Sequence, residues 1–96
     1  MVEVDEQPPS TVVRLTGELD ISNAASLQHA IEPLLEQRPE HLAFDLSAVT
    51  FMDSSGIALM LGAAARVGSL RLITPSDVIR RIVVATGLSD VLPMEP

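Results

Sequence analysis

The sequence predicts an α/β fold, in which a mixed, mostly parallel β-sheet begins with an N-terminal hairpin and packs against α-helices. Two observations predict it. Apolar residues alternate with polar ones in some segments, as in strands, and recur every three or four residues in others, as in helices. The two kinds of segment follow one another along the chain. Alternating strands and helices are typical of parallel sheets. With 47% hydrophobic and 20% charged residues in a chain of 96, we expect one compact domain over residues 1–96.

The first two expected strands form the hairpin. Met1–Glu6 reads as a short edge strand, and Thr11–Thr16 is a β-branched strand that ends at Gly17. Gln7–Ser10 between them contains two prolines, which cannot donate to a strand ladder, so it reads as a turn.

A helix is expected next, with Asp20, Ser22 or Asn23 as its N-cap. Pro33 interrupts its pattern and costs about 3 kcal/mol in a helix interior, which predicts a kink or a later start. The apolar face comprises Ala24, Leu27, Ile31, Leu34 and Leu35.

The second half of the chain predicts two further strand–helix units. A strand over 41–47 precedes a helix from about Ser55 to Arg66, and Leu70–Ile73 is a short strand. Thr74 is the expected N-cap of the third helix, Gly87 its C-cap, and the tail after residue 87 is expected to add little. The expected buried face of that helix comprises Val78, Ile79, Ile82 and Val83.

Composition excludes several classes of function. A formal net charge of −7 argues against nucleic acid and against acidic membranes as partners. The chain has no cysteine, which excludes disulfides and thiol catalysis. Met1–Glu6 lacks the basic and apolar regions of a signal peptide, and the apolar stretch Ile57–Ala65 is about half of what a membrane helix needs, so we expect a cytoplasmic protein.

The most informative segment is Asp53-Ser54-Ser55-Gly56, at the change from a strand pattern to a helix pattern. Two hydroxyls there lie near unpaired backbone N–H groups and the positive end of the helix dipole. Such a position can cap the helix, hold an anion or carry a phosphate. N-cap preferences favour a structural capping role for Ser54, and Asp53 is an alternative cap.

Catalysis and metal binding find no support in the sequence. A serine nucleophile needs a base, and nothing brings either His29 or His41 to the two serines. The G-x-S-x-G elbow, carboxylates at metal-ligand spacing and a glycine-rich phosphate loop are all absent from the sequence. We therefore expect no catalytic residue, no metal site and no cofactor.

The helix after this segment is apolar on both sides. One face, expected to lie in the core, carries Ile57, Met60, Leu61 and Ala64. The opposite face carries Ala58, Leu59, Gly62 and Ala63. An apolar outer face beside a modifiable hydroxyl indicates a partner-docking surface, although a neighbouring element that covers it would explain the same pattern.

Two segments carry a family resemblance. Leu15-Thr16-Gly17-Glu18-Leu19-Asp20 and the run from Leu42 to Gly56 resemble the STAS domain of bacterial anti-sigma factor antagonists. The match covers nearly the whole chain, and Phe51-Met52-Asp53-Ser54-Ser55-Gly56 is its most specific part. The connection over residues 66–70 is shorter than is usual in that family.

The resemblance implies a regulatory binding module without catalysis of its own. The second hydroxyl of the motif, here Ser55, would be phosphorylated by a partner anti-sigma factor, a kinase with a GHKL-type ATP site. The unphosphorylated form would bind that kinase and free the sigma factor, and a PP2C-type phosphatase would reverse the modification. Residues expected to bind the partner are Asp20, Asp53, Ser54, Gly56, Ala58, Leu59, Gly62 and Ala63. The alternative function is a structural STAS subunit of a stressosome or a lipid-transport complex.

Overall fold

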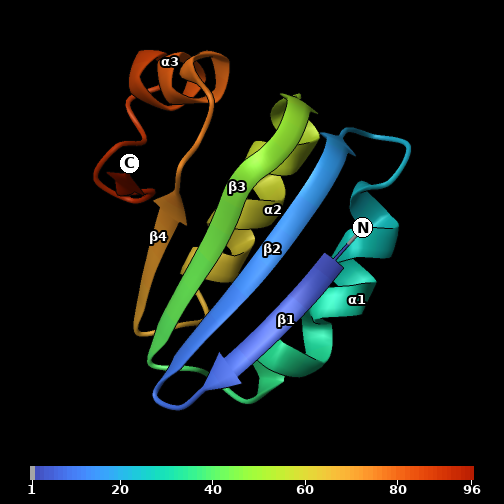
Figure 1. The fold of residues 1–96 in the computed structure, drawn as a ribbon, viewed down its shortest axis with the longest axis vertical. Helices are drawn as coiled ribbons and strands as arrows, with labels where there is room; N and C mark the ends of the chain where they lie inside the picture. The colour runs from blue at the N-terminus through green and yellow to red at the C-terminus, as the bar shows by residue number, and fades with distance from the viewer. Residues whose placement is uncertain (1) are drawn as a thin grey trace.

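In a computed structural model that describes residues 2–96, five strands form one sheet accompanied by three helices (Figure 1). The predicted fold class is confirmed, and Met1 of the expected edge strand lies outside the described residues. The elements are β1 (Val2–Gln7), β2 (Ser10–Leu19), α1 (Ala24–Glu36), β3 (His41–Met52), α2 (Ser54–Ala64), β4 (Ser69–Ile73), α3 (Asp77–Ala85) and β5 (Met94–Glu95).

The strands lie in sequence order across the sheet, from β1 to β5. β1 pairs antiparallel with β2, which confirms the hairpin, and all other neighbours are parallel. Helices α1 and α2 cover one face, and α3 lies at the end of the sheet near β4 (Figure 1). The carboxyl ends of β2, β3 and β4 therefore share one edge of the sheet, called the carboxyl edge below.

The core lies between the sheet and helices α1 and α2. Alternate residues of β2 and β3 face it, as the period of a strand requires. Phe44 at its centre has no exposed surface, and the cluster around it is almost entirely aliphatic. It includes Val13, Leu15, Leu42, Leu46, Leu72, and Leu27, Ile31, Leu34 and Leu35 of the predicted α1 face.

Strand β3 is five residues longer than the predicted 41–47. Its pairing with β2 continues to the pair Leu19↔Met52, with register shifts between Arg14 and Thr16 and between Gly17 and Glu18. Such irregularities break the alternation of side chains while the ladder of hydrogen bonds goes on. The period-2 pattern therefore ends before the strand does.

Helix α1 begins at Ala24, without the later start that Pro33 was expected to cause. Pro33 lies on the exposed side, and the helix continues to Glu36. Asn23 occupies the N-cap position, but its side-chain bonds hold the preceding loop: Oδ1 accepts from the Asp20 N–H at 3.0 Å, and Nδ2 donates to the Glu18 carbonyl at 2.6 Å.

Three predictions for the C-terminal third were wrong. The N-cap of α3 is Ser76, whose Oγ accepts from the Ile79 N–H at 3.3 Å, whereas Thr74 lies outside the helix with φ +50°. Val78, which was predicted to be buried, is 61% exposed, whereas Ile79 and Val83 are buried. The tail does contribute to the fold, because Leu92 is completely buried and β5 pairs with β4.

The predicted end of α3 is consistent with the structure. Gly87 follows the helix with φ +74°, and its N–H donates to the Val84 carbonyl. The next N–H, of Leu88, donates to the Val83 carbonyl. This pair of bonds is the Schellman arrangement, which favours glycine at that position.

Opposite charges lie in register on the sheet face away from α1 and α2. Arg14 Nε lies 3.3 Å from Asp45 Oδ2, and Asp45 Oδ1 accepts from the N–H and hydroxyl of Ser47. The N–H of Ser47 holds the pKa of the Asp45 carboxyl below its usual value; burial opposes this, and the Ser47 hydroxyl and Arg14 support it.

Acidification should reveal the contribution of Asp45 to stability. Because its folded-state pKa is depressed, its contribution is present above the unfolded value of about 3.8 and is lost as the pH falls through the lower folded value. In urea titrations between pH 6 and pH 2, the free energy of unfolding should fall less steeply with acidification for Asp45→Asn than for the wild type. Asp90→Asn, on an exposed loop, should keep the wild-type profile; identical profiles for all three proteins would refute this role.

The short connection before β4 should not tolerate a larger residue at Gly68. A Cβ there would lie 2.5 Å from the backbone oxygen of Glu40, which cannot move aside cheaply. We expect Gly68→Ala to lower the free energy of unfolding by about 1–3 kcal/mol in urea titrations. Gly62→Ala is the matched control: a Cβ there meets nothing within 4 Å, so this change in a helix should stabilise by about 0.5–1 kcal/mol.

Candidate functional site

The segment Asp53-Ser54-Ser55-Gly56 lies at the carboxyl edge, where β3 ends and α2 begins. Asp53 is the N-cap, since its Oδ1 accepts from the Ser55 N–H at 2.8 Å. Its own N–H donates to the Leu19 carbonyl at 3.1 Å, which ties the turn to the end of β2. The capping role predicted for Ser54 therefore belongs to Asp53, and Ser54 is an exposed residue of the first helical turn.

Gly56 brings this first turn close to the sheet. A Cβ on it would lie 2.6 Å from Met52 Cγ and 3.2 Å from Leu19 Cβ, so a side chain would push the helix away from both strand ends. Gly56 is itself buried. It is not a surface for direct partner contact, contrary to the prediction, and it acts by letting α2 pack closely.

Both serine hydroxyls of the motif are unengaged. Within residues 2–96, neither Ser54 Oγ nor Ser55 Oγ makes a hydrogen bond, and Ser55 is partly exposed whereas Ser54 is exposed. The two side chains stand on the first turn of α2, at the positive end of its dipole. Because Asp53 satisfies the cap, the hydroxyls are free for chemistry with an external reagent.

Asp20 occupies the corresponding position after the neighbouring strand. Leu19 and Met52 are register partners, so the residues that follow them start adjacent loops at the same edge. The carboxylate of Asp20 accepts from the N–H and hydroxyl of Ser22, which holds it in its own loop. The structure thus brings the two predicted acidic residues, Asp20 and Asp53, to one edge.

The predicted apolar outer face of α2 is only half exposed. Leu59 and Ala63 are 5% and 0% exposed, whereas Ala58 and Gly62 face outward. Leu59 and Ala63 belong to the buried side of α2, together with Ile57 and Met60, and α1 also contacts α2. A partner cannot reach Leu59 and Ala63 directly, so their predicted docking role is wrong. Ala58 and Gly62 are the exposed residues of that predicted face.

An ion pair joins the two helices at their outer surface. Arg66, just beyond α2, donates to Glu32 Oε1 of α1 at 2.6 Å. That hydrogen bond is the largest influence holding the pKa of the Glu32 carboxyl below its usual value. The pair links α1 to α2 at the surface, where both side chains are more than a third exposed, so it contributes little to stability.

Two large apolar side chains at the carboxyl edge were missed by the sequence analysis. Ile21, next to Asp20, is 83% exposed, and Phe51, two residues before Asp53, is 50% exposed. Large exposed apolar side chains are common on protein-interaction surfaces, and these two lie at the ends of neighbouring strands. The exposure of Ile21 could have been predicted, because this residue interrupts a run of capping residues and falls outside the apolar face of α1.

The histidines lie away from the motif. His41 begins β3, at the opposite end of the strand from Ser55, and its Nδ1 lies 2.7 Å from Ser69 Oγ. His29 is exposed on α1. Within residues 2–96, no three histidine or acidic side chains are grouped as metal ligands, and none of the helices has the length and apolar character needed to cross a membrane.

Comparisons with known proteins agree on one family. The model of the STAS domain family matches residues 1–96. The anti-sigma-B factor antagonist of Bacillus subtilis is 33% identical over 95% of this chain and 86% of its own length. The anti-sigma-F factor antagonist RsfB of Mycobacterium tuberculosis is 30% identical over 91% of this chain and 74% of its own.

Solved structures show the same architecture. An anti-sigma factor antagonist from Mycobacterium paratuberculosis superposes with a TM-score of 0.89 at 28% identity, over 100% of this chain and 85% of its own. The antagonist SpoIIAA in its unphosphorylated form gives a TM-score of 0.78 at 24% identity, over 100% and 88% of the two chains, which shows a shared fold.

The effects of substitutions on stability should show that Asp53, and not Ser54, caps α2. We expect Asp53→Ala to lower the free energy of unfolding by about 1 kcal/mol, because one helix N–H loses its acceptor. Asp53→Asn keeps a side-chain acceptor, so it should change the free energy of unfolding by only roughly a few tenths of a kcal/mol. Ser54→Ala is the control and should stay near the wild type in urea titrations; a larger loss there than at Asp53 would contradict the assignment of the cap.

Proposed function

Because this chain belongs to the STAS domain family, we propose that it is an anti-sigma factor antagonist, whose unmodified form binds an anti-sigma factor and so releases a sigma factor. The names of its relatives support this class of function. The observation that carries the proposal is the free Ser55 hydroxyl on the first turn of α2, at the same edge of the sheet as the exposed apolar side chains Ile21 and Phe51. We further propose that it acts in the cytoplasm.

We propose that Ser55 is phosphorylated by its partner, an anti-sigma factor kinase with a GHKL-type ATP site. Ser55 Oγ would attack the γ-phosphorus of ATP held by the kinase, the bond from that phosphorus to the β–γ bridging oxygen would break, and ADP would leave. The hydroxyl proton would pass to a base on the kinase. The role of this chain is to present the hydroxyl, and a PP2C-type phosphatase would hydrolyse the phosphoserine.

Charge gives the modification its effect on binding. A phosphate adds about −1.5 to −2 charges at pH 7. The N-terminus of α2 favours that charge, but the carboxylate of Asp53 already accepts the Ser55 N–H, and Asp20 lies at the same edge. The phosphate is therefore directed outward, into the surface that the partner would cover, where an unpaired buried charge opposes binding.

The proposed partner-binding surface combines polar and apolar groups. Its polar members are Asp20, Asp53 and Ser54, and the small residues Ala58 and Gly62 allow close approach along α2. Ile21 and Phe51 are the large exposed apolar side chains at this edge. The acidic side chains favour a partner with a basic surface, and the apolar pair favours shallow pockets within it.

Phosphate mapping tests the modification. Incubation with the partner kinase and ATP should add a single phosphate, placed on Ser55 by fragmentation mass spectrometry. Ser54→Ala should still be modified, whereas Ser55→Ala should stay unmodified and keep its affinity for the kinase. Phosphate on Ser54 would reassign the site. No phosphate, together with incorporation of the chain into a multi-subunit assembly, would favour the structural alternative.

Truncation of the exposed apolar pair tests the surface. We expect Ile21→Ala and Phe51→Ala each to weaken binding of the unmodified protein by about 1–2 kcal/mol in calorimetric titrations, because central apolar anchors carry much of the binding energy of an interface. Val91→Ala is the matched control and should bind like the wild type, because Val91 is 49% exposed, close to Phe51, and lies near Ser69 at the end of β4 opposite the carboxyl edge. Equal losses at all three positions would contradict the proposed surface.

A further inference from the structure

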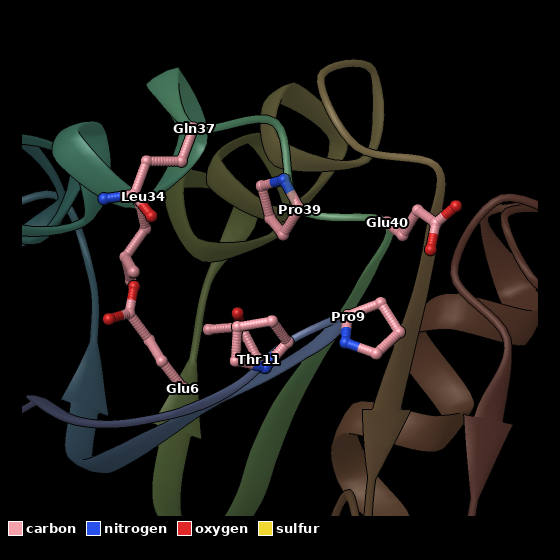
Figure 2. A pocket seen from close by; sticks show the side chains of 8 residues that line it. Glu6, Pro9, Thr11, Leu34, Gln37, Pro39 and Glu40 are labelled. Carbon is pink, nitrogen blue, oxygen red and sulfur yellow. The ribbon is translucent and has the colours of Figure 1, made fainter.

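A cavity of about 270 Å³ lies at the end of the sheet opposite Ser55, between the β1–β2 hairpin and the last turn of α1 (Figure 2). Three proline rings line it, from Pro8 and Pro9 in the hairpin turn and from Pro39 before β3. Thr11 and Leu34, both less than a tenth exposed, also line it. The hairpin and α1 thus enclose a mostly apolar hollow that the proposed partner surface does not include.

The apolar part of the cavity wall is stiff. Proline rings have almost no side-chain freedom to lose, and the buried Thr11 and Leu34 are already ordered by the core. A ligand that enters would therefore pay little for ordering its site, which is the condition under which a small apolar contact gives measurable affinity. The volume lies just under the range of drug-sized sites, so it suits a single ring.

One carboxylate faces the cavity. The side chain of Glu6 rises from β1 toward Leu34 and Gln37 of α1, whereas the carboxylate of Glu40 points away (Figure 2). Within residues 2–96, Glu6 makes no ion pair and no side-chain hydrogen bond. The apolar hollow is thus bordered by a negative charge that nothing neutralises, in a chain of net charge −7.

We propose that this cavity binds a small organic cation, a single apolar ring that carries an ammonium group on a short chain. The ring would lie against the proline rings and Leu34, and the ammonium would donate to the carboxylate of Glu6, as charge complementarity requires. The cavity and Ser55 lie at opposite ends of the sheet, so ligand and partner would bind independently. This inference does not depend on the proposed function.

Titration of the ¹⁵N-labelled protein with 2-phenylethylamine, followed by ¹H–¹⁵N correlation spectra at pH 7, tests the proposal. We expect saturable shifts at the amides of Glu6, Thr11, Leu34 and Gln37, with a dissociation constant on the order of 1 mM. The neutral analogue 2-phenylethanol should bind about tenfold more weakly, because it lacks the charge-assisted hydrogen bond. The comparison of the amine with the alcohol tests the contact between the ammonium group and Glu6 without any substitution in the protein.

Glu6→Gln and Glu40→Gln form a matched pair, since each removes one carboxylate from the rim. Glu6→Gln should weaken binding of the amine about tenfold and leave the alcohol unaffected, whereas Glu40→Gln should bind the amine like the wild type. Absence of saturable shifts, shifts confined to the carboxyl edge, or equal losses in the two variants would overturn the proposal.

Discussion

The close contact between the first turn of α2 and the ends of β2 and β3 is the constraint on which the rest of the site depends. Gly56 allows it, because any side chain there would meet Met52 and Leu19. The hydrogen bond from the Asp53 N–H to the Leu19 carbonyl fixes the same contact from the backbone. Parallel pairing of β2 with β3 then places the loops after the two strands side by side, which brings Asp20 to the edge where Ser55 stands.

A rigid platform of this kind is suited to a switch that changes a surface rather than a fold. Asp53 caps α2 in the unmodified protein, and the turn is tied to β2 through a backbone hydrogen bond that involves neither serine side chain. In the proposed mechanism, the phosphate therefore alters charge and bulk at the carboxyl edge while the core stays as it is. Ile21 and Phe51 extend the same edge with apolar area, so recognition and its control would share one surface.

The sequence predicted the order of strands and helices, the hairpin and the position of Ser55, because periodicity, turn residues and a specific motif are local signals. It failed where packing decides. Helix α2 is apolar all round, so no pattern showed that Leu59 and Ala63 would lie on its buried side. The strand β5 is too short to show a period, and it exists because β4 has a free edge for it to pair with. Phe51 stands in an irregular part of β3, where alternation does not tell which face a residue takes.

The phosphorylation switch is tested by comparing the affinity of the anti-sigma factor for the unmodified protein with its affinity for protein phosphorylated on Ser55, with correlation spectra recorded on both proteins. We predict at least a hundredfold weaker binding after phosphorylation, about 2.7 kcal/mol, with shift changes confined to the carboxyl edge and core resonances unchanged. Equal affinities would contradict the switch. Weaker binding accompanied by shifts throughout the core would contradict the claim that the phosphate acts on the surface alone.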